Sequence, residues 1–152
     1  MKYILILILF MQFCANANQK VIKIGYFEAF PFVFKNKFNK LVGILFNKLL
    51  NHLGLGGNYK IEFYEFPLAR AFFELRKENI DIFSLVTEQS FIEMKVTHRS
   101  IAVCNIQEYI FVPKETSLYL GFSKKLSPKI ILQINELIRK EQKNLEVICS
   151  LD

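Results

Sequence analysis

Three short segments of the chain have the hydrophobic pattern of β-strands. They are residues 21–27 (VIKIGYF), 59–66 (YKIEFYEF) and 80–86 (IDIFSLV). They are rich in β-branched and aromatic residues, and the second alternates apolar and polar positions, as a half-buried strand does. The pattern therefore predicts three strands at these positions.

Two helices are predicted between these strands. Over residues 41–53, apolar side chains recur every three or four positions, and Gly54 follows as a C-terminal stop. Residues 68–77 have a second apolar stripe, and Pro67 stands near its start, where proline is favoured. The order β-α-β-α-β predicts an α/β fold in which the three strands pair in parallel through right-handed crossovers.

The rest of the chain predicts two further strands and a C-terminal helix. The strands are residues 107–112 (QEYIFV) and 118–122 (LYLGF), and only residues 113–117 separate them, so we expect a hairpin-like pair. Ser127 and Pro128 suit the N-cap and the first turn of a helix. The buried stripe expected for this helix consists of Ile130, Ile131, Ile134, Leu137 and Ile138.

A ligand site is expected where the parallel strands end. In open α/β sheets, ligands bind beyond the carboxyl ends of the strands. Here those ends lead into residues 28–34, 66–70 and 87–91. The candidate ligand-binding residues at or near these ends are Glu28, Phe30, Arg70, Ser84 and Thr87.

Each candidate has a ligand-binding interpretation and a local one. Glu28 can bind a cationic or hydroxyl group or be solvated in a loop, and Phe30 can line a pocket or pack in the core. Arg70 can hold an anion or pair with a neighbouring acid. Ser84 and Thr87 can donate hydrogen bonds to a ligand or bond within a turn. The sequence leaves these alternatives open.

The N-terminal segment, residues 1–17, is interpreted as a signal peptide. Lys2 supplies a positive start, an apolar run follows, and residues 15–17 (ANA) offer the small-x-small cleavage pattern. The apolar run is short for a membrane span. An uncleaved anchor and a lipoprotein attached through Cys14 are the alternatives. Cleavage predicts a mature periplasmic domain of residues 18–152.

Composition and charge argue against several classes of function. The formal net charge is +6, but the lysines are scattered and form no basic stripe with stacking aromatics, so nucleic-acid binding is not expected. The two histidines, His52 and His98, are isolated, and no metal-ligand spacing occurs. Because no nucleophile, phosphate-loop or zinc motif is present, we predict neither an enzyme nor a bound cofactor.

Two cysteines, Cys104 and Cys149, remain after the predicted cleavage. An exported compartment permits a disulfide between them. Two free or buried thiols are the alternative, and the sequence leaves both open.

Five stretches resemble the bacterial family 3 extracellular solute-binding proteins. They are KIGYFEAFPFVF, LVGILFNKLLNHLGL, EFPLARAFFELRKENIDIFSLVT, SIAVCNIQEYIFVPK and LYLGFSKK, and the P-x-A-R-A piece at residues 67–71 is the most specific. The best-known members feed polar amino acids to ABC transporters. The resemblance implies one lobe of the type II periplasmic-binding-protein fold, with a β-α-β-α-β parallel sheet, two crossover strands and a C-terminal helix.

The chain departs from the family pattern in two ways. In the family, a second lobe lies between the two crossover strands, where this chain has only a shortened hinge at residues 113–117. The resemblance therefore implies a protein that lacks most of the second lobe. Amino-acid binders of the family often clamp the ligand carboxylate with an arginine in a T-x-x-R pattern. Ser90 occupies that position here, so this clamp is absent.

The resemblance implies an exported solute-binding protein of the ABC-transporter type. Its expected ligand is a small polar solute, such as an amino acid, and its expected partner is an inner-membrane permease. Because one lobe is missing, we expect weak or altered binding. The alternative is a non-binding remnant or an interaction protein that forms a homodimer through the exposed cleft face.

Overall fold

The computed structural model of the chain describes residues 20–30, 32–43, 45–50, 59–96, 98–109 and 113–149. The predicted signal peptide and the end of the first predicted helix lie outside these residues. Within the described part of the chain, no helix is long and apolar enough to cross a membrane.

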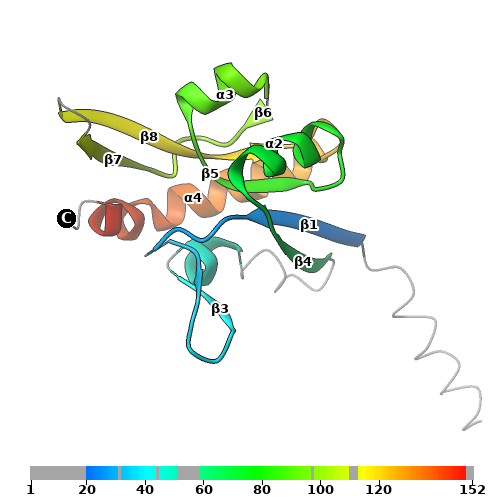
Figure 1. Cartoon of the computed structure of the whole chain (residues 1–152), viewed down its shortest axis with the longest axis horizontal. Helices are drawn as coiled ribbons and strands as arrows, with labels where there is room; N and C mark the ends of the chain where they lie inside the picture. The colour runs from blue at the N-terminus through cyan, green and yellow to red at the C-terminus, as the bar shows by residue number, and fades with distance from the viewer. Residues whose placement is uncertain are drawn as a thin grey trace, which may run out of the picture.

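A six-stranded sheet forms the centre of the domain and contains the three predicted parallel strands (Figure 1). These are β1 (Lys20–Tyr26), β4 (Tyr59–Glu65) and β5 (Ile82–Thr87), and β1 pairs in parallel with both of the others. The sheet order is β4-β1-β5-β8-β6, and β7 also pairs with β8. β8 (Pro113–Phe122) runs antiparallel to β5, and β6 (His98–Arg99) also pairs with it in the antiparallel sense. The predicted α/β fold with a parallel first half is confirmed.

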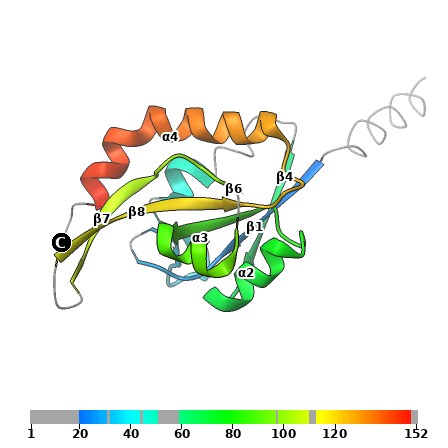
Figure 2. The same ribbon diagram turned by 90° about the horizontal axis from the view of Figure 1, so that it is seen from above.

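Helices cover both faces of the sheet (Figure 2). α4 (Pro128–Cys149) lies over one face, and α2 (Leu68–Arg76) and α3 (Glu88–Met94) lie over the other. Since successive strand residues point to opposite faces, the sheet contributes to two clusters of buried residues. Ile82 packs in the cluster beneath α4, and Phe83 packs in the cluster beneath α2 and α3.

A β-bulge in β5 shifts this alternation by one residue. The register between β5 and β8 is irregular from Phe83 to Val86, and Leu85 has a left-handed φ of 57°. As a result, Leu85 packs in the same cluster as Ile82, and Val86 packs with Phe83. Without the extra residue, Leu85 and Val86 would exchange faces.

A two-stranded arm projects from the domain (Figure 1). It consists of β2 (Phe34–Lys35) and β3 (Leu41–Val42), which pair in the antiparallel sense. The Asn36 side chain closes the arm by accepting hydrogen bonds from the backbone N–H groups of Phe38 and Lys40, at 3.0 Å and 3.1 Å. The hydrophobic pattern did not predict this arm, because residues 41–53 were predicted as a helix whose apolar stripe begins at Leu41.

The first helix consequently begins later than residue 41, where the sequence placed its start. Gly43 has a φ of 125°, and a Cβ there would lie 2.3 Å from the carbonyl oxygen of Phe32. Only glycine tolerates such a conformation and such a close approach, and the helix cannot continue back through it. Helical structure starts at Leu45 and continues as the π-helix η1 (Phe46–Leu50), with Leu45 and Leu49 fully buried.

The two crossover strands form a hairpin, as predicted, but their bounds differ from the prediction. β7 spans Cys104–Tyr109, and its last residue, Tyr109, lies opposite Pro113 at the start of β8. The predicted hinge at residues 113–117 therefore lies inside β8, and residues 110–112, between the two strands, are outside the described residues. Proline is compatible with this strand because it occupies the first position.

α4 packs its predicted apolar stripe against the sheet. Ile130, Ile134 and Ile138 are buried, and Ile131 and Leu137 are partly buried against the same cluster. The last residue of α4 is joined to β7 by a disulfide between Cys104 and Cys149, whose Cα atoms are 6.2 Å apart. The structure thus settles the question of cysteine pairing that the sequence left open.

Candidate ligand-binding rim

The carboxyl ends of β1, β4 and β5 lie at the same edge of the sheet, because these strands are parallel. β1 and β4 end level with each other, since Tyr26 pairs with Glu65 in the register. We call this edge the rim, and its polar and aromatic side chains are Tyr26, Glu28, Phe30, Lys35, Glu65, Arg70 and Thr87.

Lys35 connects several of the rim residues. The arm returns it to the end of β1, where its ammonium group contacts Glu65 Oε2 at 2.5 Å. Its backbone N–H donates a hydrogen bond to Glu28 Oε1 at 3.2 Å. The hydrogen bond with Glu65 raises the pKa of Lys35 above its ordinary value. Burial raises the pKa of Tyr26, a residue that is 4% exposed, and the neighbouring Lys35 charge partly offsets this rise.

Glu28 and Phe30 are two sequence candidates that face solvent at the rim. The side chain of Glu28 is exposed. Phe30 is 80% exposed, and its ring stands 5.1 Å from that of Phe34, at a tilted angle. An exposed carboxylate and an exposed aromatic ring, two residues apart in the chain, suit a ligand that is cationic and partly apolar.

Arg70 lies in the first turn of α2 and has a local partner. Its Nε contacts Glu74 Oε1 at 2.5 Å, one helical turn further along, and its guanidinium lies 5.1 Å from the centre of the Phe73 ring. Glu74 is 5% exposed and also accepts a hydrogen bond from Asn79 at 2.6 Å. The alternative interpretation, an arginine that pairs with an acid, therefore describes this conformation.

Ser84 and Thr87 are also part of the local structure around β5. Ser84 is fully buried in the bulge of β5, so its hydroxyl does not reach a ligand at the surface of the rim, and its Oγ has no hydrogen-bond partner among the described residues. Thr87 is the N-cap of α3: its Oγ1 accepts a hydrogen bond from Ser90 N at 3.3 Å and lies 2.9 Å from Ser90 Oγ. Ligand contact by the five candidates stays a prediction.

Sequence reasoning missed four residues that shape this edge. Tyr26 and Glu65 are the last residues of two neighbouring strands, so the predicted strand ends already pointed to them. Lys35 depends on the arm, which the pattern did not predict. Arg99 contacts Glu88 at 2.9 Å beside the start of α3, and its guanidinium lies 4.3 Å from the centre of the Tyr119 ring.

Two cavities lined by described residues lie away from the rim. One is lined by the first residues of β1 and β4 and by the start of α4, and the other by the ends of α2, α3 and β8. Both are at the amino ends of the parallel strands, so neither is part of the rim.

The arrangement of elements matches that of solved solute-binding proteins. The arginine-bound form of domain 1 from TmArgBP superimposes with a TM-score of 0.59 at 16% identity, over 79% of this chain and 92% of that chain. The fold is that of one lobe of a periplasmic solute-binding protein. The comparisons with protein-family descriptions and with curated protein sequences find no match.

Two further solved structures share this periplasmic-binding-protein fold. An ABC-transporter binding component from Wolinella succinogenes DSM 1740, complexed with lysine, gives a TM-score of 0.63 at 8% identity, over 88% of this chain and 97% of that chain. Tv2483 bound to L-arginine gives 0.62 at 10% identity, over 87% and 89%. At these identities, the likeness describes the fold, while the ligand must be argued from this chain's own residues.

Proposed function

We propose that this chain is an exported solute-binding lobe whose rim holds the cationic end of a small polar solute, such as a basic amino acid. The observation that carries the proposal is the pair of carboxylates, Glu28 and Glu65, which follow or end adjacent parallel strands and both contact Lys35. Phe30, which is 80% exposed, lies two residues after Glu28 in the chain. The rim is the edge at which open α/β sheets bind ligands.

The charges of the rim favour a cation over an anion. Glu65 is paired with Lys35, which leaves Glu28 as the exposed carboxylate without an ion pair among the described residues. The two arginines nearest the rim, Arg70 and Arg99, are each paired with a glutamate. Structures with this fold bound to lysine and to arginine support the same class of ligand.

A single lobe limits the affinity. A small-molecule pocket typically buries about 70–90% of its ligand, and one lobe covers about half of it. We expect a dissociation constant of about 0.1 mM or weaker for a monomer. The arginine-bound form of an isolated domain 1 from TmArgBP supports ligand binding by one lobe.

Export and delivery to a permease complete the proposal. Residues 1–17 have the pattern of a signal peptide. The protein from Wolinella succinogenes that shares this fold is a binding component of an ABC transporter. When the radiolabelled or epitope-tagged chain is expressed, we expect to recover it in the periplasmic extract, shortened so that it starts at Asn18. Retention of the full chain in the cytoplasm would contradict export.

Calorimetric titration of the full chain tests the preference for a cation. Lysine and cadaverine are expected to bind, and glutarate, which has only carboxylates, is not. Glu28→Gln is expected to weaken lysine binding about fivefold or more, because it removes the exposed carboxylate. Glu136→Gln, a matched change on the exposed side of α4, is the control and leaves the affinity unchanged. Glutarate binding as tightly as lysine would overturn the proposal.

The exposed aromatic residues favour one alternative, an interaction protein that dimerises through the rim. Phe30 is 80% exposed and Phe38, on the arm, is 70% exposed. Exposed aromatic patches are typical of contact surfaces. Light scattering after size exclusion distinguishes the two functions: a dimer that becomes a monomer in Phe30→Ser and binds no lysine supports the alternative.

A further inference from the structure

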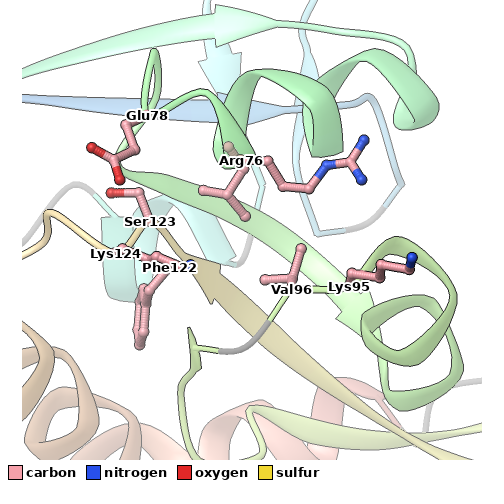
Figure 3. A pocket seen from close by; sticks show the side chains of 8 residues that line it. Arg76, Glu78, Lys95, Val96, Phe122, Ser123 and Lys124 are labelled. Carbon is pink, nitrogen blue, oxygen red and sulfur yellow. The ribbon is translucent and has the colours of Figure 1, made fainter.

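A cavity of about 220 Å³ lies between the two helices on one face of the sheet (Figure 3). Its walls are the end of α2, the residues that follow α3, and the end of β8. Phe122 of this wall pairs with Ile82, the first residue of β5. Since a strand rises about 3.3 Å per residue, the cavity lies roughly 15–20 Å from the rim.

The floor of the cavity is apolar and its mouth is charged. Leu75 and Phe122 are buried, and Val96 is partly buried. Arg76 and Lys95 are exposed at the mouth, and neither has an ion pair with a described residue. An apolar floor with two unpaired cations at the mouth suits a small carboxylate that has an apolar body.

The other side of the cavity has a different chemistry. Figure 3 shows Glu78 and Ser123 on one side, and the charged ends of Arg76 and Lys95 on the opposite side. Lys124 also lines the cavity. Because the Glu78 carboxylate disfavours a second anion beside it, an uncharged group is favoured at this end of a ligand. A neutral hydroxyl is suited to this side, since it can both donate to Glu78 and accept from a neighbouring donor.

Ser123 supplies the observation that points to a missing partner. The residue is 2% exposed, and its Oγ has no hydrogen-bond partner among the described residues. Its backbone N–H, by contrast, donates to Asp81 O at 2.9 Å, so the residue is held in place. Buried hydroxyls are normally hydrogen-bonded, and a ligand hydroxyl in the cavity would supply the missing hydrogen-bond partner of Ser123 Oγ.

We propose that this cavity is a second ligand site, specific for a small hydroxy acid with a short apolar body. The ligand carboxylate lies toward Arg76 and Lys95, the apolar body covers Phe122, and the hydroxyl group bonds Ser123 and Glu78. The site is separate from the rim, and its ligand carries no cationic group.

An NMR titration of the full chain with 6-hydroxyhexanoate tests the site. The amide signals of Val96, Phe122 and Ser123 are expected to shift. Hexanoate, which lacks the hydroxyl, and adipate, which has a second carboxylate, are expected to bind at least threefold more weakly. Saturating lysine leaves the affinity for 6-hydroxyhexanoate unchanged, so the result does not depend on whether the rim binds lysine.

Three variants assign the effect to named side chains. Ser123→Ala is expected to weaken binding about threefold to tenfold while the melting temperature stays the same or rises, because it removes a buried hydroxyl without a partner. Arg76→Gln is expected to weaken binding about twofold to fivefold. Lys77→Gln is the matched control: this neighbouring residue is exposed, packs near Phe73 and does not line the cavity.

Three results would each overturn the proposal. The first is the absence of shifts at these amides with 6-hydroxyhexanoate. The second is equal affinity for hexanoate or adipate. The third is that Ser123→Ala and Arg76→Gln both bind 6-hydroxyhexanoate as tightly as Lys77→Gln does.

Discussion

The side chains that follow the parallel strands divide into those that hold the local structure and those that remain available to a ligand. Arg70 pairs with Glu74, and Thr87 caps α3, while Glu28 and Phe30 face solvent. The predicted order of strands and helices was enough to place these residues at or near the strand ends. The spacing of four between Arg70 and Glu74 was also visible in the sequence and is typical of a helical ion pair.

The Lys35–Glu65 pair predicts a loss of stability at alkaline pH. Its hydrogen bond raises the pKa of Lys35, so its stabilising contribution is complete below the ordinary lysine value of about 10.4 and is lost as pH rises through the raised pKa. The raised pKa of the buried Tyr26 acts in the same direction. Urea unfolding between about pH 8 and pH 11 is therefore expected to show a falling free energy of unfolding above about pH 10.

Variants separate this effect from general alkaline unfolding. Lys35→Gln and Tyr26→Phe are each expected to flatten the decline above about pH 10, because each removes one titrating group. Lys129→Gln, on the exposed surface of α4, is expected to leave the slope unchanged. An identical slope in all three variants would show that the rim does not cause the pH dependence.

Among the elements, long periodic segments were predictable and features that depend on tertiary contacts were not. β1, β4, β5 and α2 follow their hydrophobic patterns to within two residues. The arm between β1 and η1 arises where the left-handed Gly43 approaches Phe32, and no local pattern signals that approach. α3 is only seven residues long, so its apolar periodicity is too short to distinguish from a loop.

Gly25 leaves room for the side chain of Ile80 beside β1. A Cβ at Gly25 would lie 2.5 Å from Ile80 Cδ1, whereas a Cβ at Gly121 would lie 3.1 Å from Leu75 Cδ2. Gly25→Ala is therefore expected to lower the free energy of unfolding by about 1–3 kcal/mol, and Gly121→Ala by less. Urea unfolding measures both. A larger loss for Gly121→Ala would contradict the packing described for β1.

In the whole molecule, the disulfide joins the hairpin to the end of the chain's last helix. Cys104 and Cys149 are 45 residues apart in sequence. Closing a loop of this length is expected to stabilise the domain by about 2–5 kcal/mol. The double variant Cys104→Ala with Cys149→Ala should lose this amount in urea unfolding, and reductant should lower the stability of the native protein but not that of the variant. Equal stability of the two proteins would show that the bond is not formed.

The domain as a whole has the fold of one lobe of a periplasmic solute-binding protein. β7 and β8 pair in the antiparallel sense, and only three residues of sequence separate the two crossover strands. The parallel strands end at the rim, where Glu28 and Phe30 are exposed. The one-lobed architecture was predictable from the shortness of the hinge segment, while the pairing of charges at the rim required the structure.

An NMR titration of the full chain with lysine tests the central claim most directly, because it locates the ligand and measures its affinity together. We expect the amide signals of Tyr26, Glu28, Phe30 and Glu65 to shift, with a dissociation constant of about 0.1 mM or weaker. The shifts should be lost or greatly weakened in Glu28→Gln. Shifts confined to another surface, or nanomolar binding by a monomer, would contradict a solute site on one open lobe.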